Sequence, residues 1–344
     1  MSNQQNGNLR VQKLLNQLSE EKTGGSDVFS VVEASPPDAI FAVKNAYAKD
    51  TDANKVNLGI GAYRDENGKP YVLNVVRKAE EFLVTRYEKG GVSKEYQKIP
   101  GDAEFVRLSQ TLMLDPASLR SGTQTKYERV ANGSMAGIQS LSGTGALRVL
   151  FNFIKNTLAK KNPNLRIFMS NPTWGNHKKI IRDAGLAPNG DMKQINTYPY
   201  IDTKTKTSLD FDGMIECLKT KPNAGDVILL HACAHNPTGV DPSDKQWEQI
   251  RAIMKERKLV PFFDCAYQGF SSGSLEKDAS AVRAFADDGF DFLLAQSYAK
   301  NLGLYGERIG CASIMCQSPE IAKKVQSQLN GVVRPMYSNP PRHG

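Results

Sequence analysis

The segment Ser297-Tyr-Ala-Lys-Asn-Leu-Gly-Leu-Tyr-Gly-Glu-Arg308 decides how this 344-residue chain is interpreted. It places Lys300 shortly after an apolar, strand-like stretch that runs from Phe290 to Ala295. Lysine is usually a solvated surface charge, so a lysine at the mouth of a buried strand needs a reason. Partial desolvation lowers the pKa of a lysine and supplies the neutral amine that attacks an aldehyde to form a Schiff base.

A carboxylate occupies the equivalent position after an earlier apolar run. Asp264 follows Leu259, Val260 and Phe263 directly along the chain. A lysine Schiff base, together with a carboxylate that partners a ring nitrogen, is the protein's part of pyridoxal phosphate (PLP) chemistry. We therefore interpret Lys300 and Asp264 as two halves of one PLP site.

The composition is that of a soluble protein large enough for two domains. Hydrophobic residues make up 40% of the chain and charged residues 23%, and no apolar stretch approaches the roughly 18 residues of a membrane span. Lys and Arg number 44 against 36 Asp and Glu, for a net charge of +8. These basic residues form no long run, so they indicate a pocket for anionic ligands rather than nucleic-acid binding.

The cysteines and histidines argue against structural cross-links and metal. Five cysteines without a CxxC pair indicate a reducing compartment, and we expect them to be small buried hydrophobes. The four histidines lack metal-ligand spacing, so no metal is expected.

Residues 1–27 read as a flexible N-terminal extension. Val11, Leu14 and Leu18 fall at helical spacing close to Arg10 and Lys13, which is compatible with a mitochondrial transit peptide. A disordered cytosolic tail is the alternative, so we expect the mitochondrial matrix or the cytoplasm.

From about residue 130 the sequence alternates between short apolar runs and amphipathic segments. The pattern predicts helices over 146–160, 177–184, 243–258 and 279–286, and strands over 165–169, 227–230, 259–263 and 290–295. Ser243 and Gln246 form a capping-box start for the third helix. Such alternation predicts an α/β fold with a mostly parallel sheet that is covered by helices on both faces.

Three polar segments each follow a predicted strand: 231–236, 264–267 and 297–300. Ligands of open parallel sheets bind beyond the carboxyl ends of the strands. We therefore expect these three segments to meet in one crevice.

A phosphate site is predicted at Ser142-Gly143-Thr144-Gly145, which precedes a helix. Glycines there let main-chain N–H groups approach an anion, and the helix N-terminus favours negative charge. Ser297 and Arg308 add a hydroxyl and a permanent cation near the lysine. The plainer alternatives are a turn that merely starts a helix and a surface ion pair of Arg308 with Glu307.

Further candidates surround the expected ring. The Asn236 amide and the Tyr267 hydroxyl could both bond to a phenolic oxygen, and Trp174 offers a flat face for stacking. Core packing is the simpler interpretation of Trp174. His177 could support Asp264 or be an ordinary buried histidine.

Taken together, the motifs resemble the aspartate aminotransferase family, which has the PLP-dependent fold type I. The resemblance runs from about Val28 to the last residue. It is carried, in order, by Asn57-Leu-Gly-Ile-Gly-Ala-Tyr-Arg64, Glu95-Tyr96 with Pro100-Gly101, Ser142-Gly-Thr-Gly145, Asn171-Pro-Thr-Trp174, His231-Ala-Cys-Ala-His-Asn-Pro-Thr-Gly239, Phe263-Asp-Cys-Ala-Tyr-Gln-Gly-Phe270, Ser297 to Arg308 and Arg334-Pro-Met-Tyr-Ser-Asn-Pro340.

The resemblance implies a role for each candidate. Lys300 would carry the cofactor and move the substrate proton, Asp264 would keep the ring nitrogen protonated, and Trp174 would stack on the ring. Asn236 and Tyr267 would hold the phenolic oxygen. The phosphate would be held by Ser142, Gly143, Thr144, Ser297 and Arg308, joined by Tyr96 of the neighbouring subunit. Gly61 would line the substrate side, with Trp174 and Asn236, and Arg334 would reach across a homodimer to the substrate's side-chain carboxylate.

The resemblance also implies a domain layout. Residues 28–70 would form the N-terminal part of a small domain and a dimer arm, and 71–335 the large PLP-binding domain. Residues 336–344 would begin a further small-domain segment, which in the family carries a second arginine for the substrate α-carboxylate. Because the printed sequence ends at Gly344, we expect a C-terminally truncated chain with little or no transamination.

The expected activity is PLP-dependent amino transfer from L-aspartate to 2-oxoglutarate, which yields oxaloacetate and L-glutamate. Two alternatives stay open at this point. One is a truncated, non-catalytic paralogue that binds PLP, and the other is an aminotransferase with an aromatic substrate range.

Overall fold

The computed structural model describes residues 28–35, 39–56, 61–91, 93–187 and 192–342. Contacts divide the chain into two units, Met1–Gly61 and Ala62–Gly344. Helix α2 (Ala39–Lys49) belongs to the first unit, and the other helices and strands named below belong to the second. This division precedes the boundary predicted after residue 70, and helix α14 runs without a break across the one predicted after residue 335. The predicted transit-peptide helix lies outside the described residues.

The second unit is built on a seven-stranded sheet with the order β1-β7-β6-β5-β4-β2-β3. Neighbours are parallel from β6 to β3, whereas β7 runs antiparallel to both β6 and β1. Its strands are β1 (Met135–Leu141), β2 (Ile167–Asn171), β3 (Ile195–Pro199), β4 (Val227–His231), β5 (Val260–Cys265), β6 (Phe292–Ser297) and β7 (Ile309–Met315).

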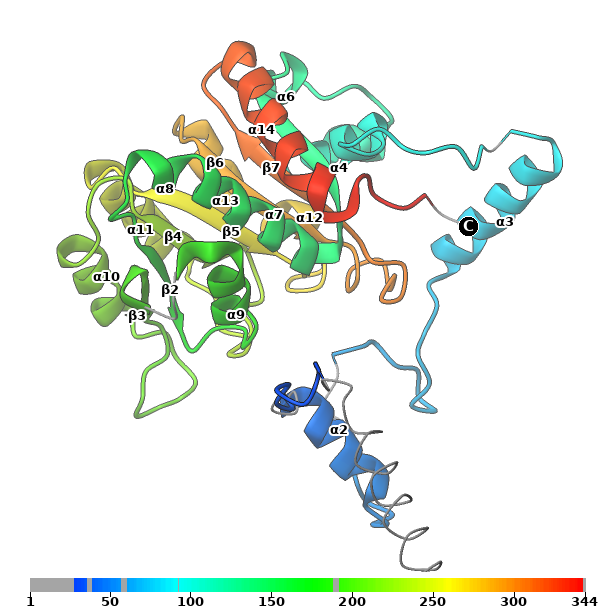
Figure 1. Ribbon diagram of the computed structural model, residues 1–344, viewed down its shortest axis with the longest axis horizontal. Helices are drawn as coiled ribbons and strands as arrows, with labels where there is room; N and C mark the ends of the chain where they lie inside the picture. Colours follow the sequence, from blue (N-terminus) through cyan, green and yellow to red (C-terminus); the bar gives the residue numbers. More distant parts are fainter. Residues whose placement is uncertain (1–27, 36–38, 57–60, 92, 188–191, 343–344) are drawn as a thin grey trace, which may run out of the picture. The chain divides into compact units, whose positions relative to one another are not determined.

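Helices lie on both sides of this sheet (Figure 1). They are α4 (Ala103–Leu114), α5 (Pro116–Ser121), α6 (Glu128–Ala131), α7 (Ser142–Asn156), α8 (Leu158–Lys161), α9 (His177–Ile181), α10 (Phe211–Thr220), α11 (Asp244–Glu256), α12 (Leu275–Asp278), α13 (Ser280–Asp287) and α14 (Pro319–Tyr337). Helix α3 (Asn74–Glu88) precedes them in the chain and buries none of its residues.

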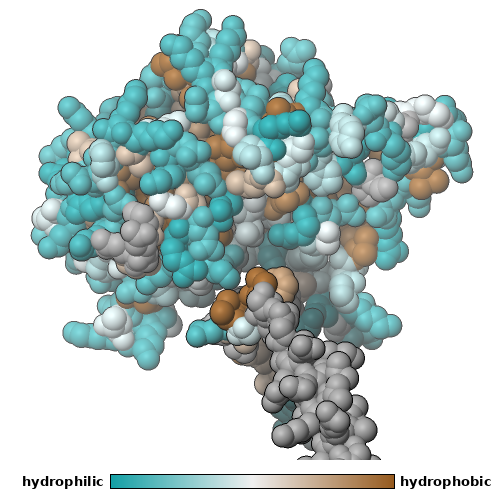
Figure 2. All heavy atoms as spheres, in the orientation of Figure 1, coloured by the Kyte–Doolittle hydropathy of each residue, from teal (hydrophilic) through white to brown (hydrophobic). Residues whose placement is uncertain are grey.

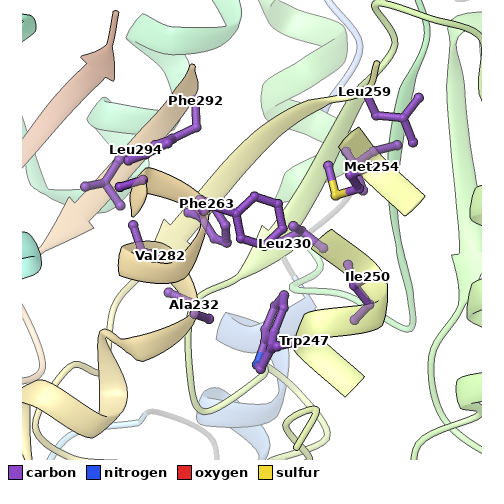
Figure 3. Close-up of a cluster of buried hydrophobic side chains, with 14 of the residues drawn as sticks. Leu230, Ala232, Trp247, Ile250, Met254, Leu259, Phe263, Val282, Phe292 and Leu294 are labelled. Carbon is purple, nitrogen blue, oxygen red and sulfur yellow. The ribbon is translucent and has the colours of Figure 1, made fainter. Parts of the chain in front are cut away.

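Alternation along the central strands explains why both faces are covered. Successive side chains of a strand point to opposite faces, and in β5 both Phe262 and Phe263 are fully buried. Phe262 joins the apolar cluster under α7 and α14, where its ring lies 4.8 Å from that of Phe151. Phe263 joins the opposite cluster under α10, α11 and α13 (Figure 3), 5.2 Å from the Phe285 ring.

The predicted fold is confirmed in its central part. Each predicted strand and helix overlaps an observed one, and Ser243 caps α11 with the expected capping box. The predicted helix over 177–184 continues past α9 as a π-helical turn, Arg182–Leu186. The sequence patterns missed β1, β3, β7, α10 and α14, among other elements.

The surface of the second unit is mostly hydrophilic in the view of Figure 2. Helix α3 differs from its neighbours because it buries none of its residues and exposes Val75, Phe82 and Val84. None of the helices in the described ranges combines the length and apolar content needed to cross a membrane. All five cysteines are buried and free, as expected of small apolar side chains.

Replacing Phe263 with alanine should cost about 3–5 kcal/mol of unfolding free energy. Its ring is fully buried and meets both Phe285 and Phe292 edge-on, so a cavity would open in the core of the sheet. Chemical denaturation measures the loss. Phe270→Ala is the control, because this side chain is 48% exposed, and an equal loss in both variants would contradict the packing described here.

Candidate active site

The predicted segments meet at one edge of the sheet. β1, β2, β4, β5 and β6 all run in the same direction, and their carboxyl ends precede Ser142, Thr173, the loop 232–241, the loop 266–274 and Lys300. The register fixes their relative heights, since His231 lies opposite Asp264 and Asp264 lies opposite Ala295. Five separate segments of the chain therefore meet at this edge.

Asp264 is held by a chain of side-chain hydrogen bonds. Its Oδ2 lies 3.0 Å from His177 Nε2, and His177 Nδ1 lies 2.8 Å from Thr173 Oγ1. Thr173 Oγ1 lies 3.3 Å from His231 Nε2, and His231 Nδ1 accepts the Asn236 main-chain N–H at 3.0 Å. The chain thus links Asn236, in the loop after β4, to Asp264, the penultimate residue of β5.

The hydrogen bond from the Asn236 N–H to His231 Nδ1 sets the direction of the other bonds in this chain. Because His231 Nδ1 accepts from Asn236, a neutral His231 ring carries its hydrogen on Nε2 and donates it to Thr173. The Thr173 hydroxyl hydrogen is then left for His177 Nδ1, and His177 Nε2–H donates to Asp264. Burial, reinforced by His235, lowers the pKa of His231 well below its usual range, so this ring stays neutral.

Asn236 and Tyr267 approach each other from neighbouring loops. Burial is the largest cause that raises the pKa of the Tyr267 hydroxyl, and Asp264 and Tyr305 raise it further. A side-chain hydrogen bond with Asn236 acts in the opposite direction. The two side chains predicted to share one phenolic oxygen are therefore already neighbours.

Lys300 is half-buried beyond the end of β6. Burial lowers the pKa of its amine, and the nearby charge of Arg308 lowers it further. Its Nζ lies 5.0 Å from the centre of the Tyr305 ring, and Tyr305 in turn influences Tyr267. The amine therefore lies at the same edge of the sheet as Asn236 and Tyr267, and it is neutral more readily than an exposed lysine.

The predicted phosphate site has its hydroxyls together. Ser142 Oγ lies 3.1 Å from Ser297 Oγ, and the Ser142 N–H donates to the Arg308 carbonyl at 3.0 Å. A Cβ on Gly143 would come within 2.9 Å of Ser297 Cβ, so only glycine lets the start of α7 approach β6 this closely. Ser142 and Arg308 both have left-handed backbones, with φ of 62° and 54°, a strain that is typical of functional sites.

For the other predicted site residues, the structure shows contacts with residues other than Lys300 and Asp264. Trp174 is half-buried, packs against the cluster under α7 and meets the His177 ring edge-on at 5.3 Å. Tyr96 is 87% exposed, and Arg334 is an exposed residue near the end of α14 whose guanidinium donates to the Ser338 hydroxyl at 2.7 Å. Gly61 belongs to the other unit, and the Asn57-to-Arg64 motif falls partly on residues outside the described ranges.

The sequence did not predict the residues that support Asp264 indirectly, by hydrogen bonds to its partner His177 or beyond it. Thr173 and His231 join Asp264 to the rest of the edge, although each reads as an ordinary turn or strand residue. His177, His231 and Asp264 also bring potential metal-ligand atoms within 4.8 Å of one another, which their sequence spacing did not predict. In the bonding described above, these atoms are engaged with each other and with Thr173.

Comparison with known proteins assigns the family. The sequence profile of the class I and II aminotransferases matches residues 53–344. The chain therefore belongs to the class I and II aminotransferases, enzymes that act on amino acids and oxo acids.

The chain is 49% identical to the cytoplasmic aspartate aminotransferase of Oryza sativa over 93% of its length and 72% of that relative's. It is 46% identical to the mitochondrial aspartate aminotransferase of Gallus gallus, covering 93% of the chain and 70% of the relative. An aromatic-amino-acid aminotransferase structure from Burkholderia pseudomallei, covalently bound to pyridoxal phosphate, superposes with a TM-score of 0.80 at 40% identity over 92% of this chain and 73% of that one. The resemblance and the predicted fold are thereby confirmed.

Thr173→Val should destabilise the protein by about 1–3 kcal/mol, because it leaves one buried histidine donor and one acceptor unpaired. Valine matches threonine in shape, so the loss isolates the hydroxyl. Thr173→Ser is the matched control, since it keeps the hydroxyl and removes only a methyl group. Equal unfolding free energies for the two variants would contradict the directed bond chain.

Proposed function

We propose that this edge of the sheet binds PLP and that the protein transfers the amino group of L-aspartate to 2-oxoglutarate. The observation that carries the proposal is the half-buried Lys300, with its lowered pKa, at the same edge as the histidine-supported Asp264. The names of the rice and chicken relatives support the choice of aspartate.

The residues present fit PLP at each of its polar groups. Ser142 and Ser297 bring two hydroxyls together at the start of α7, where hydroxyls and main-chain N–H groups suit a phosphate dianion. Arg308, whose guanidinium donates to the Tyr305 carbonyl at 3.1 Å, is the proposed cation of this site. Asp264 suits a protonated ring nitrogen, and the Asn236–Tyr267 pair suits the phenolic oxygen. Gly143, Thr144 and Trp174 complete the proposed cofactor contacts.

When bound, PLP supplies an electron sink that stabilises negative charge at the substrate Cα. Asp264 accepts from His177 on one oxygen, which orients the carboxylate and leaves its other oxygen for a ring nitrogen. Lys300 is the base in this proposal, because its amine is neutral more readily than an exposed lysine and can take the Cα proton. Gly61, Trp174 and Asn236 would contact the substrate.

We further propose a homodimer in which Tyr96 and Arg334 serve the neighbouring subunit's site. Both side chains are exposed, and neither contacts Lys300 through any bond described above. Helix α3 offers apolar side chains that lack burial within the chain, including Phe82 at 62% exposure. Such a face is typical of subunit interfaces. The guanidinium of Arg334 suits two-point binding of a carboxylate.

An aromatic substrate range is the second candidate. The Burkholderia pseudomallei structure is named as an aromatic-amino-acid aminotransferase and shares 40% identity. Substrate profiling with aspartate, phenylalanine and tyrosine would separate the two. For location we propose the mitochondrial matrix or the cytoplasm, the two compartments named for the chicken and rice relatives, and an import assay would choose between them.

Lys300→Ala should abolish covalent attachment of PLP to the protein. The wild type loaded with PLP should absorb in the visible, and borohydride should fix the cofactor on Lys300. Peptide mass spectrometry locates the label, and Lys277→Ala, which changes an exposed lysine, is the control. A label on another lysine, or no aspartate-dependent change in the wild-type spectrum, would contradict the proposal.

Arg308→Gln should move the pH dependence of Lys300 reactivity to higher pH. The neutral amine is the reactive form, so attachment of pyridoxal speeds up as the pH rises through the pKa of Lys300. The Arg308 charge lowers that pKa, and its removal raises it. Using pyridoxal, which lacks the phosphate, separates this effect from phosphate binding, and an unshifted profile would show that Arg308 does not act on the amine.

Mixing two inactive chains tests the shared site. If Arg334 serves the neighbouring subunit, a hybrid of Lys300→Ala and Arg334→Ala chains has one site with both residues intact. In chains extended by the C-terminal segment that the resemblance implies, some aspartate turnover should therefore return on mixing. No recovery in verified hybrids would mean that both residues act within their own chain.

A further inference from the structure

Asp241, which is not among the proposed cofactor contacts, anchors the loop after β4 through hydrogen bonds. The Asp241 carboxylate accepts the N–H of Ala234 at 2.6 Å and the N–H of His235 at 2.9 Å. These bonds flank the backbone of Ala234, which has a left-handed φ of 46°. A non-glycine residue keeps such a conformation only where its surroundings hold it. Asn236, the next residue, takes its position from this loop.

A second aspartate fastens the loop after β5, which carries Tyr267. Asp278 is 4% exposed and accepts the N–H groups of Gly269, Ser271 and Ser272 at 2.8, 3.1 and 3.1 Å. It also accepts the Ser272 hydroxyl at 2.6 Å. Its two oxygens therefore anchor four donors of one loop.

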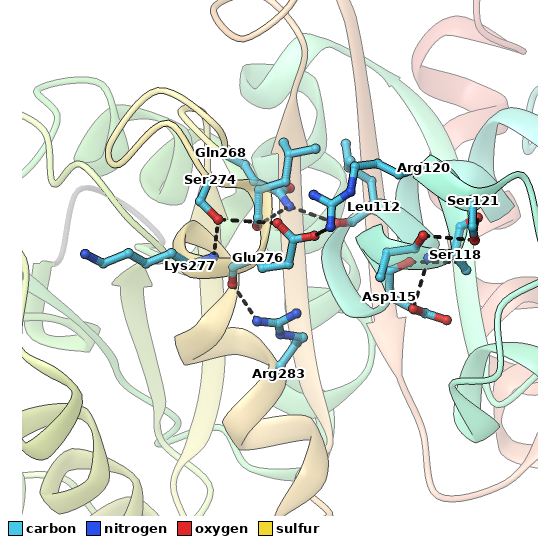
Figure 4. Close-up of polar contacts among 12 residues, drawn as sticks. Leu112, Asp115, Ser118, Arg120, Ser121, Gln268, Ser274, Glu276, Lys277 and Arg283 are labelled. Atoms are coloured by element: carbon cyan, nitrogen blue, oxygen red, sulfur yellow. Dashed lines mark hydrogen bonds and ion pairs between the residues drawn. The ribbon is translucent and has the colours of Figure 1, made fainter.

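The loop is also anchored right beside Tyr267. The Gln268 amide donates to the main-chain oxygens of Leu112 and Leu275 at 2.8 and 3.1 Å (Figure 4). Arg120 forms an ion pair with Glu276 in the same network. Gln268, the residue after Tyr267, is thus attached to α4 and α12.

Ser271 joins the two loops. Its N–H donates to Asp278, and its hydroxyl donates to Asp241 at 3.3 Å. One serine therefore lies between two carboxylates, each of which fastens a different loop. Asp241 and Ser271 lie five and four residues after Asn236 and Tyr267 in the sequence, so this link joins the two loops that carry those side chains.

We propose that Asp241, acting with Ser271, is a positioning residue that fixes the spacing of Asn236 and Tyr267. The inference rests on the proposed function, in which both side chains donate to the phenolic oxygen of PLP. Two donors can bond to one acceptor only while their separation stays within a few tenths of an ångström, because hydrogen bonds weaken steeply with distance and angle. Loops that are fastened independently would drift relative to each other.

The molecule offers a matched control for this role. Asp202 also accepts two main-chain N–H groups, those of Lys204 and Thr205, at 2.7 and 2.9 Å. It lies in a turn after β3 that holds none of the proposed cofactor contacts. Asp202→Asn therefore repeats the chemical change of Asp241→Asn, with similar lost bonds, in a turn that holds no proposed cofactor contact.

The test is a pH titration of the visible absorption of the PLP-loaded protein. In PLP attached to Lys300, the Lys300 nitrogen shares its proton with the phenolic oxygen. Hydrogen-bond donors to that oxygen reduce its negative charge, so the nitrogen loses its proton at a lower pH. In Asp241→Asn the donors lose their spacing, and the midpoint should move to higher pH by about half a unit or more. In Asp202→Asn the midpoint should stay at the wild-type value. The other ionisable groups near Lys300 and Tyr267, namely Asp264, Tyr305 and Arg308, are unchanged in both variants.

Ser271→Ala keeps the experiment decisive if Asp241→Asn does not fold. This variant removes only the bond between the loops, and its midpoint should move in the same direction. A midpoint equal to wild type in Ser271→Ala, or equal shifts in Asp241→Asn and Asp202→Asn, would overturn the inference while leaving the proposed function intact. A wild-type protein without pH-dependent visible absorption would contradict the proposed function, and the inference with it.

Discussion

The parallel pairing of β4, β5 and β6 is the constraint on which the rest of the structure depends. It sets His231 opposite Asp264 and Asp264 opposite Ala295, so that residues more than 60 positions apart in the sequence meet at one edge. The strands are buried on both faces, which leaves their carboxyl ends as the place where polar side chains can be brought together. Asn236, Tyr267 and Lys300, which follow these three strands, owe their shared edge to this register.

Asp264 shows how the fold tolerates a carboxylate beside its core. A partly buried charge needs hydrogen-bond partners to offset its lost hydration. The structure provides one through His177, whose own orientation is fixed by Thr173 and His231. The polar chain is therefore both a structural requirement of the buried edge and the device that orients the carboxylate toward a ligand.

The sequence predicted the central strands and Lys300, Asp264, Asn236 and Tyr267 because each of these residues follows an apolar run. It did not predict β1 or β7, since Gln139 and Ser313 interrupt their apolar patterns with buried polar side chains. The roles of Thr173, His231 and Asp241 were not predicted, for a different reason. Their importance lies in bonds between loops from different strands, and no spacing within one segment reveals such bonds. The roles of Tyr96, Arg334 and Gly61 remain predictions.

The single direction of the bonds that end at Asp264 has an electrostatic consequence. Each N–H or O–H along the chain from Asn236 points toward the carboxylate, so the bond dipoles add instead of cancelling. The sheet edge thus carries a standing polarisation whose positive end faces Asp264 before any ligand arrives. Water would have to reorient to respond to a new charge there, whereas these groups are already aligned and have no reorganisation left to undergo.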